Sequence, residues 1–437
     1  MALLLRTSRL KAGAFAVVLF GATAGLALTP AAAASAEPAR TISVNPGGDV
    51  NAAIARARTG DTVALRPGTY RGTVRVDKAI TLSANQATVD APDDGAAIAV
   101  AADNVTIDSV ATSCSHAAGS PTGIAVTTQH ARIVGAAVLQ CATGIRLDGA
   151  RDAYLQGDSL LGSRSAGGHG VGVSASDADG ATMLGNTFED DDTGVLVRGT
   201  ATPLLDSNTF SQVGTAVELD AVSEAVVNGT LVVGATGPAV LVTGSRGAEI
   251  ARLNPAGNGN GAGPAIELSA ASGPSSVVDV EDSSLAHFGT GLTIDAGSVT
   301  GSVIVIGTTF DGVERAAIVV AAGAGGTVNA TIGDYFGGCG PRAPDHGYDG
   351  GGAVVLDPER AVAYSENNCR APASAVPATS GGNASPPPAA NNATGGSSGI
   401  DLPSAIGSTL VTIGVSVLLG VCAGGVLYAI RRNRHVH

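Results

Sequence analysis

The sequence predicts an all-β solenoid in which short parallel strands coil turn upon turn. Three observations predict it: a pattern that recurs about every 24 residues, short apolar runs with a period of two, and no 3.6-residue helical period inside the repeats. The chain of 437 residues has 62 Gly, 44% hydrophobic residues, 14% charged residues and no Trp. Glycine without a Gly-X-Y period excludes collagen, and steady use of Val, Ile and Leu excludes disorder throughout.

The repeat starts with a small residue that is followed by apolar-x-apolar. Its ten starts lie 21 to 26 residues apart, which is far beyond coincidence. They are Ala97, Gly123, Gly144, Gly170, Gly194, Ala216, Ala239, Ala265, Gly291 and Ala317. Alternation along a strand places Ile145 and Leu147 inside and Arg146 outside. The matching outward column is Ala99, Ala125, Arg146, Gly172, Leu196, Glu218, Leu241, Glu267, Thr293 and Val319.

A second short strand follows about nine residues after each start, and then comes a turn with a polar residue and an apolar one. Gly185-Asn186-Thr187-Phe188 is an example of this turn. We expect Phe188, Phe210, Phe310 and Phe336 to stack as one internal ladder. A leucine-rich repeat has a similar period, but its Leu-x-x-Leu-x-Leu frame is missing, and a propeller blade needs about 40–45 residues.

The start of the repeating body carries a recognisable order of elements. A strand, a short amphipathic helix, a strand that ends in Pro-Gly-Thr-Tyr and a further strand occupy Thr41–Val44, Asp49–Ile54, Gly60–Tyr70 and Ala79–Leu82. This order resembles the opening of the right-handed parallel β-helix, or pectate-lyase-like, superfamily. Residues 333–358 resemble the closing turn of secreted members, with Tyr335 and Phe336 in place of tryptophans.

The resemblance covers about residues 41–369 and implies a right-handed parallel β-helix of about 11–12 coils. It also implies that the short helix caps the open end of the coil, because an uncapped end exposes a sheet edge to other chains.

The amino-terminal segment, residues 1–36, is typical of a signal peptide. Arg6, Arg9 and Lys11 precede an apolar run, and Ala34-Ser35-Ala36 offers a cleavage site. An uncleaved anchor is the alternative.

The carboxyl-terminal end predicts a membrane anchor. The apolar run Ala405–Ile430 is long enough for a helix that crosses a bilayer, and the basic residues after it predict a cytoplasmic tail. Leu402-Pro403 resembles the start of a sortase signal, but the Thr-Gly that a sortase cleaves is missing. Gly420 and Gly424 form a G-x-x-x-G that favours weak dimerisation.

These segments divide the chain into five parts. They are a signal peptide (1–36), a β-helix ectodomain (37–370), a linker rich in Pro, Ser, Gly and Asn (371–402), a transmembrane helix (403–430) and a cytoplasmic tail (431–437). The sequence therefore predicts a single-pass protein of the cell membrane with its ectodomain outside.

Four of the five cysteines lie in the ectodomain, which suits an oxidising exterior. Four cysteines allow three pairings. We favour Cys114 with Cys141 and Cys339 with Cys369, because each pair joins neighbouring repeats.

Many members of the superfamily cleave or epimerise acidic polysaccharides, so the resemblance raises the question of a catalytic site. Gly168-His169-Gly170 followed by Glu189–Asp192 resembles the polygalacturonase set of a Gly-His-Gly and paired aspartates. The order is reversed here, and the Arg-Ile-Lys of that family is missing. His169 as a turn residue and the acidic run as a solvated corner are the alternatives.

Pectate lyases hold calcium with aspartates on adjacent coils and use an arginine or lysine as the base. Asp190, Asp191, Asp192 and Asp206 could supply the oxygens, and Arg198 the base. The Asp-Pro-His-Asp motif of alginate epimerases is absent. Asp345, His346 and Asp349 form a weaker metal candidate, for which a capping loop is the alternative.

Charge and composition limit the partners. Residues 41–370 carry 35 acidic and 17 basic groups, a net charge of −18, which disfavours nucleic acid and unbridged anionic polymers. The ectodomain also lacks Trp as a platform for sugars. We therefore expect a non-catalytic structural or binding module that contacts a cell-envelope glycan or protein and needs no cofactor. The alternative is a polysaccharide lyase or hydrolase, for which calcium is a possible cofactor and Asp190, Asp191, Asp192 and Arg198 are the candidate catalytic residues.

Overall fold

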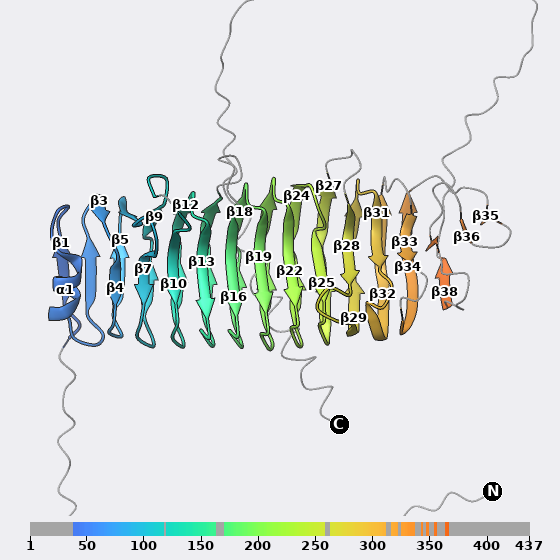
Figure 1. Ribbon diagram of the computed structural model, residues 1–437, viewed down its shortest axis with the longest axis horizontal. Coiled ribbons are helices and arrows are strands. Elements are labelled where there is room, and N and C mark those ends of the chain that lie inside the picture. Colours follow the sequence, from blue (N-terminus) through green and yellow to red (C-terminus); the bar gives the residue numbers. More distant parts are fainter. Residues whose placement is uncertain are drawn as a thin grey trace, which may run out of the picture. The chain divides into compact units, whose positions relative to one another are not determined.

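The computed structural model describes residues 38–336, apart from residues 118, 163–169, 258–262, 312–315 and 322–324, together with four short strands beyond them. All of these residues lie in one compact unit, Met1–Ala375. Successive turns stack along one axis and build about 11 turns with almost no helix (Figure 1).

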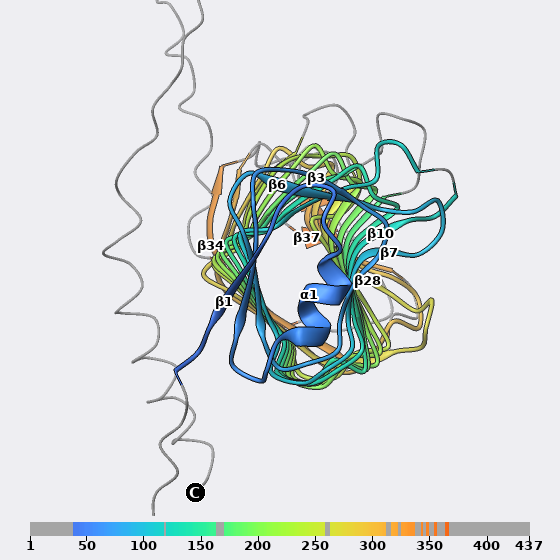
Figure 2. The same ribbon diagram turned by 90° about the vertical axis from the view of Figure 1, so that its left-hand side faces the viewer.

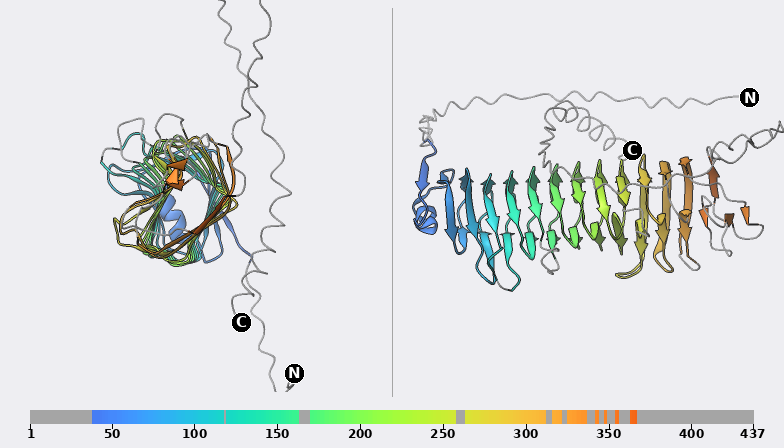
Figure 3. Two further views of the ribbon diagram at one scale, coloured as in Figure 1. Left: turned by 90° about the vertical axis from the view of Figure 1, so that its right-hand side faces the viewer. Right: turned by 90° about the horizontal axis from the view of Figure 1, so that it is seen from above.

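Each turn contributes strands to three faces, which close around a packed interior (Figures 2 and 3). The first face consists of β1 (Thr41–Val44), β2 (Thr62–Leu65), β5 (Thr81–Ala84), β8 (Thr106–Asp108), β11 (Arg132–Val134), β14 (Tyr154–Gln156), β17 (Thr182–Leu184), β20 (Leu204–Asp206), β23 (Val226–Asn228), β26 (Ala248–Ala251), β29 (Ser275–Glu281), the first parts of β32 (Val299–Asp311) and β34 (Thr327–Phe336), and β38 (Ala363–Glu366).

The second face follows the first across what we call the first corner. It consists of β3 (Gly68–Arg71), β6 (Ala87–Asp90), β9 (Ala111–Ser113), β12 (Ala137–Leu139), β15 (Ser159–Leu161), β18 (Thr187–Glu189), β21 (Thr209–Ser211), β24 (Leu231–Ala235), β27 (Asn254–Gly257), β30 (Ser284–Ala286) and the ends of β32 and β34.

The third face follows across the second corner. It consists of β4 (Val74–Val76), β7 (Ala96–Val100), β10 (Thr122–Val126), β13 (Thr143–Asp148), β16 (Val171–Ser176), β19 (Thr193–Arg198), β22 (Thr215–Asp220), β25 (Val240–Thr243), β28 (Pro264–Ser269), β31 (Thr290–Ile294), β33 (Ala316–Val320) and β37 (Val354–Val355). Two antiparallel strands, β35 (Arg342–Ala343) and β36 (Gly347–Tyr348), continue this sheet beyond β37.

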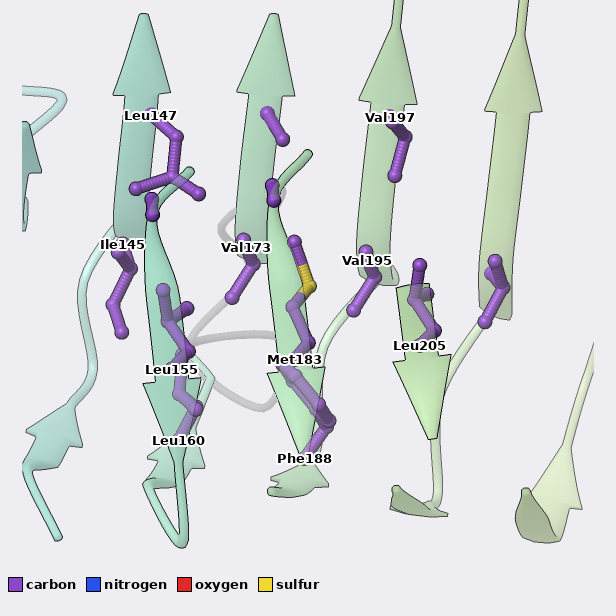
Figure 4. Close-up of a cluster of buried hydrophobic side chains, with 14 of the residues drawn as sticks. Ile145, Leu147, Leu155, Leu160, Val173, Met183, Phe188, Val195, Val197 and Leu205 are labelled. Atoms are coloured by element: carbon purple, nitrogen blue, oxygen red, sulfur yellow. The ribbon is translucent and has the colours of Figure 1, made fainter. Parts of the chain in front are cut away.

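The strands pair in parallel with the same face of the turns before and after. On the third face, Ile124 aligns with Ile145 and Ile145 with Val173, so like positions stack in columns. The backbone groups of each turn therefore find partners in the next turn, and apolar side chains that point inward from successive turns pack into one core, part of which Figure 4 shows.

The expected capping helix is present as α1 (Val50–Arg56). Asp49 begins it, since its carboxylate accepts a hydrogen bond of 2.9 Å from the backbone N–H of Ala52. Val50, Ala53 and Ile54 are buried, and α1 lies across the first end of the coil (Figure 2).

The repeat start predicted at Gly170 is wrong by two residues. Val171 aligns with Thr143 and Thr193, so Gly172 occupies the inward slot of Gly144 and Gly194. Ser174, and not Gly172, therefore lies in the outward column. Two glycines two residues apart fit the same pattern, but the inward slot has no room for a side chain, because a Cβ at Gly172 would lie 2.6 Å from Cδ1 of Phe188.

The prediction of one continuous phenylalanine ladder is also wrong. Phe188 and Phe210 stack with ring centroids 4.6 Å apart and planes 9° apart. The column continues with Val232, which aligns with Phe210. Further along, Phe310 aligns with Tyr335, whereas Phe336 aligns with Asp311.

One of the expected disulfides is confirmed. Cys114 and Cys141 are bonded across adjacent turns, with Cα atoms 4.8 Å apart. Cys339 and Cys369 lie outside the described residues.

The two end segments are likewise outside the described part of the chain. The signal peptide, the linker with Leu402-Pro403, the transmembrane helix with Gly420 and Gly424, and the tail therefore stay predictions. In the residues that the structure does describe, no helix has both the length and the apolar character that a bilayer crossing requires.

Candidate functional site

The acidic run Asp190–Asp192 lies at the second corner, between β18 and β19. The structure does not present it as one exposed cluster. Asp190 and Asp192 are partly exposed, whereas Asp191 is 1% exposed and points into the core.

Asp191 occupies a slot that is apolar in the next turn. Phe188 and Glu189 align with Phe210 and Ser211, so Asp191 stacks on Val213, which is fully buried. Burial, and then the charges of Asp190 and Asp192, raise the pKa of Asp191 to about 8. The raised pKa favours the protonated form of this carboxyl at neutral pH, and its burial hides it from any glycan, so Asp191 is poorly placed to act as a catalytic base.

Arg198 is the last residue of β19 and lies on the outer side of the third face. Its Nε lies 3.1 Å from Oδ2 of Asp220, and its Nη2 lies 3.8 Å from Oε1 of Glu218. Both carboxylates belong to β22 in the next turn, where Leu196 aligns with Glu218 and Arg198 with Asp220. We call Arg198, Glu218 and Asp220 the third-face cluster.

The third-face cluster is separate from the acidic corner. Asp192 precedes β19 and Arg198 ends it, and six residues of extended chain span about 20 Å. The structure therefore does not bring together the arginine and the aspartates that the sequence offered as one catalytic set.

The calcium hypothesis requires Asp206 to lie close to the acidic run Asp190–Asp192, and the structure separates them. Asp206 ends β20 on the first face, where its Oδ1 accepts hydrogen bonds from Asn228 Nδ2 (2.9 Å) and Ser207 Oγ (3.0 Å). Asp206 and the acidic corner therefore lie on different sides of the coil. In the described ranges, no group of three or more His, Cys, Asp or Glu side chains is placed to hold a metal ion.

Several candidate residues fall outside the described residues. They are Gly168, His169, Asp345, His346 and Asp349. Gly170 is described, and its carbonyl accepts hydrogen bonds from the N–H groups of Asp192 (2.9 Å) and Thr193 (3.1 Å). The backbone carbonyl of Gly170 therefore joins the acidic corner to the preceding turn by hydrogen bonds.

Glu218 is the half-buried carboxyl of the third-face cluster. Burial raises the pKa of this half-buried carboxyl, and Arg198 opposes the rise while Asp220 adds to it. Two turns further along the same column, burial and Asp295 raise the pKa of Glu267. Glu218 and Glu267 are thus separated by Leu241 in the outward column, and Arg198 pairs with the first of them.

Sequence reasoning missed Asp220 as the partner of Arg198. The signal was available, because the two residues are 22 apart, which is the length of that turn. Residues one turn apart on an outward column are neighbours in any parallel coil.

Of the two tyrosines whose side chains the structure describes, one is buried and the other is partly covered. Tyr70 is buried, and its hydroxyl donates to the carbonyls of Val44 and Arg66. Tyr154 lies on the outer side of the first face, but the guanidinium of Arg132 covers one side of its ring at 4.3 Å from the centroid.

Buried polar side chains form a ladder along the first corner. Asp158 Oδ1 accepts a hydrogen bond from Ala136 N (2.7 Å), Asn186 Oδ1 accepts one from Asp158 N (2.9 Å), and Asn208 Oδ1 accepts one from Asn186 N (2.9 Å). Each side chain thus satisfies a backbone N–H of the turn before it. This polar ladder holds the coil together and takes no part in a surface site.

Comparison with known proteins agrees with this architecture. Residues 122–272 match the family described as the right handed beta helix region. No curated protein matches the chain.

Among solved structures, the chain is similar to the A-module of mannuronan C-5 epimerase AlgE6 from Azotobacter vinelandii, with 14% identity, a TM-score of 0.52, and coverage of 65% of this chain and 93% of that one. It also matches an alginate lyase from Paenibacillus sp. str. FPU-7 (16% identity, TM-score 0.46, 55% of this chain and 93% of that one). A third match is the GH136 lacto-N-biosidase from Eubacterium ramulus (10% identity, TM-score 0.49, 75% of this chain and 68% of that one).

At sequence identities this low, the similarity shows a shared fold and does not show a shared activity. Stacked parallel strands on three faces, the capping helix and the family match over residues 122–272 agree with one another. The body of this chain is therefore a right-handed parallel β-helix of the pectate-lyase-like fold.

Proposed function

We propose that this chain is a β-helix module displayed outside the cell on a single membrane anchor, where it binds a cell-envelope glycan or protein without transforming it. One observation carries the non-catalytic part: the candidate catalytic residues are split. Asp191 is enclosed in the core, whereas Arg198 lies about 20 Å along β19 and is paired with Asp220 and Glu218. Two catalytic groups must reach the same scissile linkage, about 5–10 Å apart at most, which Asp191 and Arg198 cannot do.

The turnover test uses the full chain purified in mild detergent. We expect no new reducing ends and no unsaturated products from alginate, pectin or neutral glucans, with or without added calcium. Retention of one of these polymers, or of envelope material, on the immobilised chain would identify the partner class. Sustained turnover at a rate proportional to protein concentration would contradict the non-catalytic proposal.

The second candidate is a polysaccharide lyase or hydrolase, and the third-face cluster is the observation that favours it. Two carboxylates and an arginine meet there on adjacent turns, and Glu218 has the raised pKa that suits a general acid. The matched variants are Glu218→Gln and Asp148→Asn, since Asp148 is an outward carboxylate that pairs with Arg146 (3.3 Å) on the same face. Turnover that E218Q abolishes and D148N preserves would establish this enzyme.

The location is tested separately in intact cells that produce the chain with an epitope tag after His437. We expect an antibody against the β-helix to bind intact cells, because the predicted signal peptide and the predicted membrane anchor together imply that the body lies outside. The tag should become accessible only after permeabilisation. A β-helix that is accessible only in lysed cells would contradict the display proposal and would leave the turnover test unaffected.

A further inference from the structure

Two carboxyl groups inside the coil have no role in the proposed function. Asp158 and Asp191 are each 1% exposed. In each, the Oδ2 atom is buried without a hydrogen-bond partner. An ionised carboxylate in such a place is poorly compensated for the loss of water, because Oδ2 of each group has no donor or cation beside it, so burial favours the protonated form of both groups.

Among the residues that the structure describes, none beside Asp191 supplies a compensating positive charge. Its Oδ2 packs against Gly172, where a Cβ would lie 2.8 Å away, and its Oδ1 packs against Gly162. The residue stacked on it in the next turn is the apolar Val213. The charges that act on it are those of Asp190 and Asp192, and both oppose its ionisation.

Asp158 belongs to the polar ladder, where its neighbours are amides. Asn208 Nδ2 donates to the carbonyl of Met183 at 2.9 Å, and Asn186 Nδ2 donates to that of Leu155 at 3.4 Å. Leu155 aligns with Ile133, so the equivalent acceptor for Asp158 is the carbonyl of Ile133.

A carboxylate has no hydrogen to donate to that acceptor, and only a protonated Asp158 can continue the pattern. Ala136 and Asn186, which stack on either side of it, are uncharged.

The two groups lie in adjacent turns. Asp158 is in the turn of β14, β15 and β16, and Asp191 is in the turn of β17, β18 and β19. Asp191 packs against Gly162 and Gly172 of the other turn, and its own carbonyl accepts the N–H of Gly214 from the turn beyond (2.9 Å). Ionisation of Asp191 therefore disturbs the contact between consecutive turns in the middle of the coil.

We propose that Asp158 and Asp191 form a proton latch, which keeps the turns from β14 to β19 closed while both carboxyls are protonated and loosens them when the protons leave. The latch concerns the body of the coil and is independent of whether the third face binds or transforms a partner. The latch stabilises the stacked turns at acidic pH, and these turns open more readily at alkaline pH.

The sign follows from the two pKa values. Burial raises the pKa of Asp158 to about 7 and that of Asp191 to about 8, from 3.8. The folded state therefore holds protons that the opened state releases, and the stabilisation is complete below about pH 4, falls as pH rises, and is lost above about pH 8.

Hydrogen–deuterium exchange of the full chain at pH 5.5 and pH 9 tests the latch, with each rate divided by the intrinsic rate at that pH. We expect the normalised exchange of β15 to β19 to increase at least tenfold at pH 9, while β7 and β10, which contain no titratable side chain, stay unchanged. Asp191→Val, which copies Val213, should remove most of the increase, and Asp158→Asn should remove part of it. Asp206→Asn, a surface control, should leave it intact.

Val213→Asp adds a second readout, because it places a carboxyl in the same slot one turn further on. We expect the alkaline-sensitive region to extend to β21 and β22. If D191V fails to fold, Asp191→Asn serves in its place. An equal alkaline increase in the wild-type chain and in the Asp158→Asn, Asp191→Asn double variant would overturn the latch, and so would the absence of any increase in the wild-type chain.

Discussion

Replacing Gly194 by alanine should destabilise the β-helix by about 2–3 kcal/mol, although the change adds a single methyl group. The space that a side chain at Gly194 would need is already occupied from two sides. A Cβ there would lie 2.5 Å from Cε1 of Phe210 and 2.8 Å from the carbonyl oxygen of Ala216 in the next turn. One contact is a buried ring and the other is backbone, so neither can yield without moving the stacked turns.

The chain itself suggests the compensating change. One turn later Ala216 takes the slot of Gly194, and Val232 takes the place of Phe210. Phe210→Val should therefore be destabilising alone, through the cavity it leaves, yet should relieve the strain of Gly194→Ala. We expect a favourable coupling energy of about 1–2 kcal/mol in the double-mutant cycle.

Urea unfolding followed by circular dichroism at one pH measures all four proteins of this cycle. Gly263→Ala is the matched control, because a Cβ at Gly263 would meet its nearest atoms only at 3.9 Å. We expect this control to change the free energy of unfolding by less than about 1 kcal/mol. Additive effects of G194A and F210V would show that the ring does not set the size of the slot.

The same slot explains why the sequence reveals the fold so readily. Every turn repeats a small residue at the point where the next turn and an inward side chain meet, and this residue marks the period. The pattern fails only where two small residues compete, at Gly170 and Gly172. Nine residues separate β15 from β16, whereas three separate β18 from β19, and the register is known only from the pairing of Val171 with Thr193. Sequence spacing alone cannot supply this pairing.

The candidate site was harder to predict because it depends on the corners. Alternation holds within a strand, so the outward positions of Arg198 and Glu218 follow from the sequence. At the second corner, however, Gln140, Asp190 and Gln212 have φ values of 55° to 60°. A left-handed residue resets the alternation, and it turns Asp191 inward where a run of four acidic residues suggests a solvated loop. The left-handed conformation of Asp190 thus places the carboxyl of Asp191 in the core, where burial favours its protonated form, and not on the surface.

Replacing Asn208 by leucine should be the most damaging change in the polar ladder, with a loss of about 3–5 kcal/mol. Asn208 is fully buried. Its Oδ1 accepts hydrogen bonds from the N–H of Asn186 (2.9 Å) and from Asn186 Nδ2 (3.1 Å), and its Nδ2 donates to the carbonyl of Met183 (2.9 Å). Leucine has a similar volume but leaves these groups unpaired in the core, at a cost of about 1–3 kcal/mol each.

Asn208→Thr separates the loss of hydrogen bonds from a change of shape. Threonine occupies the next position of the ladder, at Thr230, and its hydroxyl can accept the N–H of Asn186 as Thr200 accepts that of Ala178 (3.2 Å). We therefore expect N208T to lose less stability than N208L in the same urea unfolding measurement. Asn228→Leu removes the partly exposed bond to Asp206 and should cost less than about 1 kcal/mol. If N208L unfolds at the same urea concentration as N228L, the ladder is not what joins successive turns, and the stacked apolar columns alone must hold the coil together.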